Sequence, residues 1–156
     1  MSGDMVYQYA VKLLLGFYAR GKESEKDPLR ADGRYFTNVN VHNPWRHKVS
    51  YFWKVAASGR NGVAGRYTKW TPCSLNADEA TDFCSFDLTG LSAHTLFFDG
   101  YFVIESEEEL DVVGVYTTER PQEKGVATMH MERVPARRVC RPEYRPLRPA
   151  TKARHR

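Results

Sequence analysis

The sequence predicts an all-β protein, an antiparallel β-sandwich of about seven to eight strands with an extended basic C-terminal tail. Short runs alternate apolar and polar side chains, which is the period of a half-buried strand. Turn residues separate these runs every eight to twelve residues or so, as in sandwiches and barrels. Prolines interleave with arginines after residue 138, where neither a helix nor a central strand is sustained. We therefore expect a sandwich domain over residues 1–138 and a tail over residues 139–156.

The first half of the chain contains a predicted hairpin. Residues 6–15 also suit a short helix, but their β-branched and aromatic side chains favour a strand, which is a candidate for edge pairing between subunits. Residues 21–33 are charged and rich in turn formers, so we expect an exposed loop. Residues 34–42 alternate strictly, Asn43-Pro44 supplies a turn, and residues 48–57 alternate again. This pattern predicts that the two strands pair as an antiparallel hairpin.

Further strands follow at regular spacing. Gly100 interrupts one dense apolar run and suggests a β-bulge there. The acidic residues 107–109 suggest a solvated turn that also blunts a sheet edge. The remaining expected elements are a short aromatic strand over 66–71, a connector over 76–79, strands over 80–86, 96–105, 110–118 and 126–134, and a loop over 119–125.

The amino-acid composition limits which classes of protein the chain can belong to. With 42% hydrophobic and 13% aromatic residues, a chain of 156 residues can bury the core of one domain without a disulfide or a metal ion. No apolar run approaches the roughly 20 residues of a membrane span, and no secretory leader is recognisable, so we expect a cytoplasmic protein without membrane insertion. The three cysteines have no CxxC spacing. Reduced thiols are expected, and a pairing of Cys73 with Cys84 stays open.

Positive charge is concentrated at the C-terminus. Residues 137–156 hold eight Lys or Arg and one Glu, a formal charge of +7, whereas the whole chain carries +4 and its remainder therefore −3. A cationic arm on a mildly acidic body is typical of an adaptor or assembly protein more than of an enzyme. The predicted partner-binding residues of this tail are Arg137, Arg138, Arg141, Arg145, Arg148, Lys152, Arg154 and Arg156.

Three segments carry a resemblance to known proteins: RYFTNVNVHNP at residues 34–44, FFDGYFVIESEEELDVVGVYT at 97–117 and MERVPARR at 131–138. Across roughly residues 34–138 the chain resembles small uncharacterised bacterial β-sandwich proteins and, more distantly, the soluble sensory rhodopsin transducer family. The resemblance implies an antiparallel β-sandwich that assembles into a homotetramer. The family supplies no catalytic residues to carry over, and this chain departs from it in the loop near residues 22–30 and in the arginine tail.

Catalytic, metal and cofactor motifs are absent from the sequence. No nucleophile elbow, P-loop or dinucleotide fingerprint occurs, so we expect no enzyme, no cofactor and no catalytic residue. The histidines lack HxH or HxxxH spacing, and we expect no metal site. One alternative remains, in which His42 and His130 converge with Cys84 or with Asp99.

The leading functional hypothesis is a non-catalytic assembly or adaptor protein that forms a homo-oligomer, as a tetramer or larger assembly, and docks partners through its termini. The tail then lies over an acidic surface, either of a partner protein or near residues 105–111 of another copy. A second hypothesis is a module that binds a small molecule or carbohydrate on a face with Asn38, Asn40 and His42, next to the early aromatic residues. A third is nucleic-acid binding through the basic tail.

Overall fold

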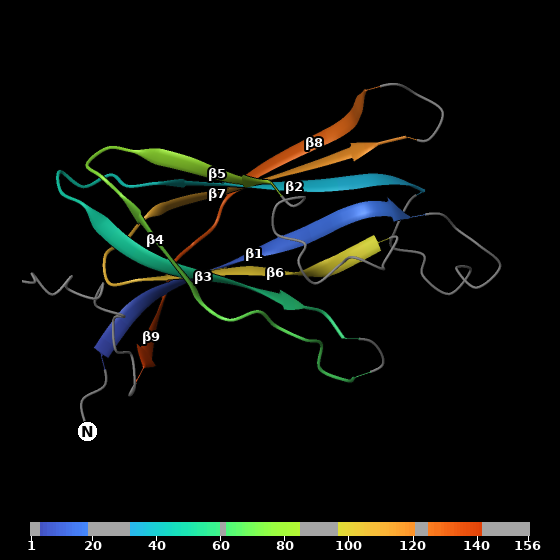
Figure 1. Ribbon diagram of the computed structural model, residues 1–156. Coiled ribbons are helices and arrows are strands. Elements are labelled where there is room, and N and C mark those ends of the chain that lie inside the picture. Colours follow the sequence, from blue (N-terminus) through green and yellow to red (C-terminus); the bar gives the residue numbers. More distant parts are fainter. Residues whose placement is uncertain (1–3, 19–31, 60–61, 85–96, 121–124, 142–156) are drawn as a thin grey trace, which may run out of the picture.

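The computed structural model describes residues 4–18, 32–59, 62–84, 97–120 and 125–141. These residues contain no helix and form nine antiparallel strands of one continuous sheet (Figure 1), so the all-β antiparallel prediction is confirmed. None of them belongs to a helix long and apolar enough to cross a lipid bilayer. The strands are β1 (Asp4–Tyr18), β2 (Gly33–His42), β3 (Val49–Ala57), β4 (Thr71–Leu75), β5 (Ala80–Cys84), β6 (Phe97–Ser106), β7 (Asp111–Glu119), β8 (Val126–Arg133) and β9 (Arg137–Arg141).

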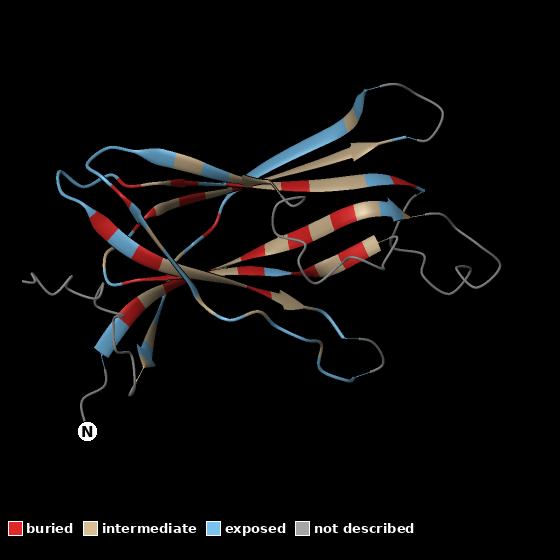
Figure 2. Cartoon of the chain, viewed as in Figure 1, coloured by how far each residue is buried: buried red, intermediate tan, exposed pale blue. Residues whose placement is uncertain are grey.

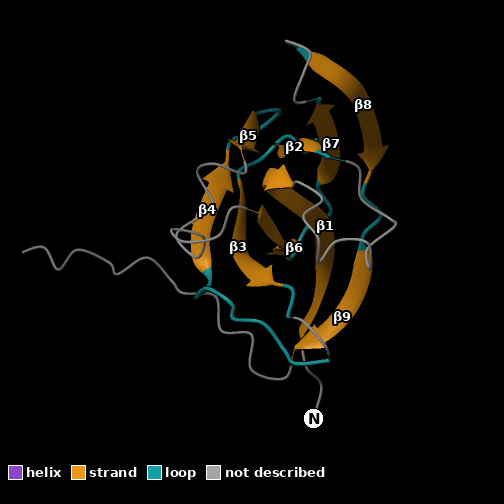
Figure 3. Ribbon diagram, turned by 90° about the vertical axis from the view of Figure 1, so that its right-hand side faces the viewer, coloured by secondary structure: helices purple, strands orange, loops and turns teal. Residues whose placement is uncertain are grey.

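The sheet is curled, so that two halves face each other. One half runs in the order β4-β3-β6-β1, and the other contains β2, β7 and β8, with β5 on the second side of β2. The halves are joined where the end of β1 pairs with the start of β2, from Gly16↔Tyr35 to Tyr18↔Gly33. Figure 3 views this curl from its end. Because hydrogen bonds connect all nine strands, a sandwich of two separate sheets is not confirmed.

The core lies between the two halves. Alternate side chains of β1 point inward, which is the period-two pattern that the sequence shows. Figure 2 shows the resulting red bands of buried residues on β1, β6 and β3. Fully buried valines of β2 and β7 come from the opposite half. The core cluster comprises Tyr9, Val11, Leu13, Leu15, Val39, Val41, Val49, Tyr51, Val55, Leu75, Phe98, Phe102, Ile104, Leu110, Val112 and Val134.

The predicted hairpin of residues 34–42 and 48–57 is wrong, although both strands exist. Strand β2 pairs with β1, β5 and β7, whereas β3 pairs with β4 and β6. Asn43 explains the difference. Its fully buried side-chain amide contacts the carbonyl oxygens of His47 at 2.8 Å and of Asn76 at 2.8 Å. The turn therefore carries the chain from one half of the sheet to the other instead of reversing it onto its neighbour.

Two local predictions are also corrected. Residues 66–71 form no strand; Tyr67 makes an isolated bridge with Ala56, and the strand begins only at Thr71. Gly100 pairs in regular register, and the irregularity lies at Thr118/Glu119. The glycine serves close approach, because a Cβ there would lie 2.5 Å from the Ala56 carbonyl oxygen.

The ends of the chain differ from expectation as well. The expected edge strand over residues 6–15 lies within β1, an inner strand between β6 and β2 in the sheet order. Strand β9 pairs with the first residues of β1, from Asp4↔Arg141 to Gln8↔Arg137. Residues 139–141 therefore belong to the sheet, and β9 extends past the expected domain boundary at residue 138. The predicted loop over 21–33 lies outside the described residues except for Asp32 and Gly33.

Candidate functional site

Four described strands, β4, β5, β8 and β9, pair with another strand on one side only. Open edges invite pairing with another chain, and proteins block them with short length, proline or charge. Strand β4 is five residues long and contains Pro72. Strand β5 also has five residues and carries Asp82, while the five residues of β9 include three arginines. Strand β8 has eight residues, and its first six, Val126–Met131, carry no proline, Lys, Arg, Asp or Glu.

Strand β8 also exposes apolar side chains. The exposed fractions of Val126, Met129 and Met131 are 65%, 62% and 61%, and Figure 2 shows that exposure extends along most of the strand. Met131 pairs across from Val115, which is half-buried on the outward face of β7. The outward side of β7–β8 is therefore an apolar strip beside an open sheet edge. We call this strip and edge the β8 surface, made of Val113, Val115, Val126, Met129 and Met131.

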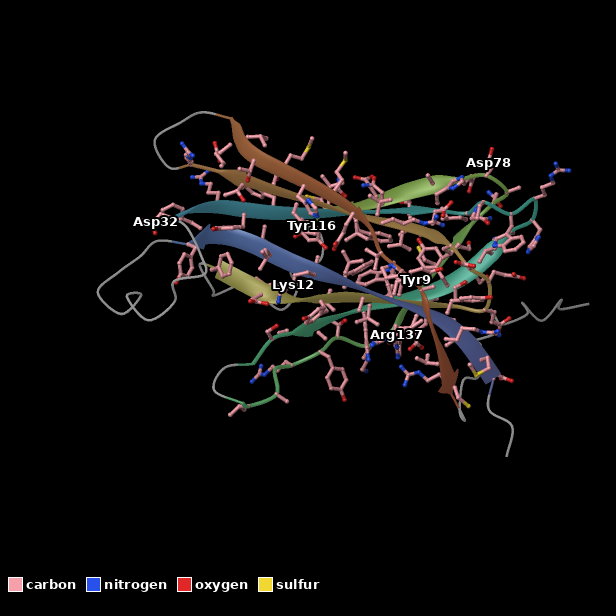
Figure 4. The ribbon with its side chains drawn as sticks, turned by 180° about the vertical axis from the view of Figure 1, so that it is seen from behind. Tyr9, Lys12, Asp32, Asp78, Tyr116 and Arg137 are labelled. Atoms are coloured by element: carbon pink, nitrogen blue, oxygen red, sulfur yellow. The ribbon has the colours of Figure 1, made fainter. Side chains whose placement is uncertain are left out.

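The opposite side of β8 holds the strand against the body. The Tyr116 ring stacks on His130 with centroids 6.1 Å apart, and its hydroxyl donates to Glu132 Oε1 at 2.7 Å. Burial, followed by the hydrogen bond to Glu132, raises the pKa of Tyr116. Figure 4 shows Tyr116 near the β2–β7 half of the sheet. These contacts anchor β8 through one face, leaving its apolar face outward.

An ionic cluster anchors the end of β8. Asp111 accepts from Arg133 Nη2 at 2.6 Å and lies 3.4 Å from His42 Nδ1. His42 Nε2 lies 3.1 Å from Asp78 Oδ1, and this hydrogen bond is the main reason that the pKa of His42 is raised. The two aspartates use opposite ring nitrogens, so they do not converge on one ion. Among the described residues no group of three or more metal-ligating side chains is arranged to hold a metal.

A second polar network fixes β9 to the body. Glu105 Oε1 accepts from Gln8 Nε2 at 2.6 Å and from Arg141 Nη2 at 2.5 Å. Arg137 donates to Gln8 Oε1 from Nε at 2.7 Å and also from Nη2. The Glu105 side chain is only 3% exposed, so its charge is compensated inside the protein. Figure 4 shows Arg137 near β1 and β9.

The predicted tail residues therefore divide into two groups. Arg137, Arg138 and Arg141 lie in β9 and contact their own chain, with the Arg138 guanidinium 5.4 Å from the Tyr7 ring centroid. Arg141, at the start of the tail, contacts Glu105 of the predicted acidic segment, and this contact lies within one chain. Arg145, Arg148, Lys152, Arg154 and Arg156 lie outside the described residues, and their partner binding stays a prediction.

The predicted ligand face is brought together along β2. Asn38, Asn40 and His42 alternate with the buried Val39 and Val41, so they share the outward side. Asn38 Nδ2 lies 3.4 Å from Asp82 Oδ2, and Asn38 Oδ1 is buried without a hydrogen-bond partner. Asn40 is exposed, and His42 is engaged as described above. Ligand binding at this face remains a prediction.

The other candidate ligands are dispersed. His130 stacks on Tyr116, and Asp99 hydrogen-bonds the hydroxyl of Ser58 at 2.9 Å, so the expected alternative site of His42 and His130 does not form among the described residues. Cys73 and Cys84 are free thiols, which settles their open pairing. Among the early aromatic residues, Tyr51 is fully buried and Trp53 lies 5.3 Å from Phe102, whereas Tyr67 is exposed.

Two features escaped the sequence reasoning. Glu105 is a buried acid in a dense apolar strand, and a buried carboxylate generally needs a cationic partner. The arginines at the start of the tail are the residues that could supply this cation. Met129 and Met131 recur with period two in residues 126–134, opposite the polar Thr128, His130 and Glu132. This alternation predicts a strand, and a methionine pair on one face is also typical of an adaptable interface.

Comparisons with known proteins give information about the fold. No protein-family model matches the sequence, and no curated protein matches it either. The structure is similar to the crystal structure of Thermotoga maritima 1070, with a TM-score of 0.53 and 7% sequence identity. The similarity covers 86% of this chain and 95% of that chain. At this identity it supports a shared all-β fold and carries no statement about function.

Proposed function

We propose that this protein is a non-catalytic assembly protein whose subunits associate through the β8 surface. The observation that carries the proposal is that β8 combines an open edge, a run of six residues without charged groups and three apolar side chains more than half exposed. Contiguous apolar surface beside an open strand edge is uncommon in a monomer and typical of an association site.

A second copy of the chain is the occupant that fits this surface best. Antiparallel pairing of β8 with its own copy about a two-fold axis satisfies the free backbone groups of both strands at once. It also brings the Met129 and Met131 side chains of the two copies together on one face. Methionines adapt well to such a contact because their unbranched side chains are flexible and polarisable. The resemblance to the homotetrameric sensory rhodopsin transducers supports the same proposal, as do the blocked edges β4, β5 and β9.

The direct test is the native mass of the full chain, measured by native mass spectrometry and by light scattering over a concentration series. We expect a dimer or a multiple of it for the natural sequence. The double variant Met129→Lys, Met131→Lys should be monomeric at the same concentration, because four like charges would face each other across the two-fold axis. Val63→Lys is the matched control, since Val63 is 71% exposed on a loop and should leave the mass unchanged.

Two results would refute the proposal. One is a monomer of the natural sequence at every concentration; the other is an unchanged oligomer in the double variant whose far-ultraviolet circular dichroism shows an intact fold. Deleting residues 142–156 separates the contribution of the tail, because β9 and its ionic network remain in place. If the truncated protein is monomeric while the double variant stays oligomeric, the assembly depends on the terminus instead of on β8.

The alternatives are kept apart by different measurements. A small ligand or carbohydrate on Asn38, Asn40 and His42 should raise the melting temperature in a thermal-shift panel, because ligand binding stabilises the native state by mass action. Nucleic-acid binding by the tail should be lost on deleting residues 142–156 and should fall steeply with salt. We expect Arg137 and Arg141 to contribute little to the binding of nucleic acid, since their side chains already hydrogen-bond Gln8 and Glu105.

A further inference from the structure

A row of side chains crosses the outward face of β3, β6 and β1, on the far side of the sheet from the core. Ala56 pairs with Tyr67 on one side and with Tyr101 on the other, and Tyr101 pairs with Lys12. Directly paired residues share a face of the sheet. The two tyrosine rings therefore flank the small Ala56, and two strand spacings place their backbones about 10 Å apart. Tyr67 is 72% exposed and Tyr101 is 43% exposed.

Cations are placed against the rings of this row. The Lys54 ammonium lies 4.5 Å from the Trp70 ring centroid and 5.4 Å from that of Tyr67. Within the described part of the chain Lys54 forms no ion pair with a carboxylate, and the two rings stabilise its charge. Lys12 lies 4.7 Å from the Tyr101 ring centroid and forms an ion pair with Asp99. Asp99 also accepts a hydrogen bond from the Ser58 hydroxyl at 2.9 Å.

We propose that this row binds an anionic oligosaccharide, a chain of pyranose units that carry carboxylates. Exposed tyrosine rings offer flat apolar faces to sugar rings, and their separation lets them contact different units of one chain. Lys54 supplies an uncompensated cation for a sugar carboxylate. Asp99 and Ser58 provide an acceptor and a hydroxyl for sugar hydroxyl groups. Lys12 is already paired with Asp99, which leaves Lys54 as the cation of this row that faces a ligand, fewer than the run of cations with which proteins track a polyphosphate.

The proposal is independent of the β8 surface, which lies on the other half of the sheet. The test is isothermal titration of the full chain with an alginate hexasaccharide, with maltohexaose as the uncharged sugar and a dodecamer of deoxythymidine as the polyphosphate. We expect the alginate hexasaccharide to bind, and Tyr67→Ala, Tyr101→Thr and Lys54→Met each to weaken it by about tenfold or more. Phe17→Ala is the matched control, because Phe17 is 39% exposed and outside the row.

Each other outcome contradicts the proposal. Absence of binding, or binding that Phe17→Ala weakens as much as Tyr67→Ala, removes the site. Equal binding of maltohexaose shows that the carboxylates are not recognised. Tighter binding of the deoxythymidine dodecamer that depends on the same three residues assigns the row to single-stranded nucleic acid instead. The Met129→Lys, Met131→Lys variant should bind the hexasaccharide unchanged, so a failure of the assembly proposal and a failure of this one are distinguishable.

Discussion

The hydroxyl of Tyr9 makes two hydrogen bonds to the backbone of Leu110. It donates to the Leu110 carbonyl oxygen at 2.8 Å and accepts from the Leu110 amide at 2.7 Å. Both residues are buried, with exposed fractions of 1% and 2%. Burial raises the pKa of Tyr9 to about 12. Near pH 7 the phenol is neutral, so it can both donate and accept a hydrogen bond. One side chain of β1 thereby ties down the turn between β6 and β7.

Replacing this phenol tests how much the contact stabilises the fold. Tyr9→Phe keeps the ring and leaves both buried backbone groups of Leu110 without that partner, which should lower the free energy of unfolding by about 1–3 kcal/mol. Urea denaturation of the two proteins measures the difference. Tyr67→Phe is the control and should change stability little, because Tyr67 is 72% exposed. Equal stability of Tyr9→Phe and the natural protein would mean that water replaces the hydroxyl.

The sequence predicted the strands better than their neighbours. Residues 34–42 and 48–57 alternate because every second side chain faces the core, and this pattern can be read within each strand alone. Which strands pair depends on the path of the segment that connects them. A turn after residue 42 is compatible both with a hairpin and with a crossover to the other half of the sheet. The buried Asn43 amide decides for the crossover by binding carbonyl groups of residues 47 and 76. Such long-range hydrogen bonds leave no periodic signal.

The candidate surfaces were predictable to a similar, partial extent. The cationic tail was visible from charge alone, but its first arginines are engaged by Gln8 and Glu105, which lie 97 residues apart in sequence. The β8 surface required two facts that composition does not contain: that β8 ends the sheet order and that its first six residues lack edge-blocking groups. Sequence reasoning placed the open edge at residues 6–15 because nothing local distinguishes an inner strand from an outer one.

The network around Glu105 predicts unequal effects of the β9 arginines. Arg141→Met removes the cation that hydrogen-bonds a nearly buried carboxylate, and we expect a loss of about 1–2 kcal/mol in unfolding free energy, moderated because Arg141 itself is 42% exposed. Arg138→Met is the matched control, since it removes only the contact with the Tyr7 ring and should cost less than about 1 kcal/mol. Urea denaturation compares them. Adding Glu105→Gln to Arg141→Met should recover part of the loss; identical costs for the two arginines would argue against a buried charge pair.

The close approach of β3 and β6 predicts intolerance at Gly100. A methyl group there would lie 2.5 Å from the Ala56 carbonyl oxygen and 2.9 Å from the Phe98 ring, so one strand or the ring must move. We expect Gly100→Ala to lower the free energy of unfolding by about 1–3 kcal/mol, as overpacking generally does. Thermal and urea unfolding measure it. A loss below about 0.5 kcal/mol would show that the two strands separate easily at this position.

His42 predicts a pH dependence of stability. The hydrogen bond with Asp78, and then that with Asp111, raises the pKa of His42 above its ordinary value of 6.5. A raised folded pKa means that the folded state binds the proton more tightly than the unfolded chain does. The stabilisation is therefore complete below about pH 6.5 and disappears as the pH rises through the folded pKa. Its size should stay below about 1 kcal/mol, since the His42 side chain is 37% exposed and solvent screens the pair.

The variant His42→Gln isolates this contribution, because glutamine keeps a polar side chain that does not titrate. The difference in unfolding free energy between the natural protein and His42→Gln should be larger near pH 5.5 than near pH 8.5. The exposed His47, which lies 3.6 Å from Glu108, provides the control in His47→Gln. A pH-independent difference for His42→Gln, or an equal pH dependence in His47→Gln, would show that the Asp78–His42–Asp111 cluster is not what links β2, the β4–β5 turn and β7 to proton binding.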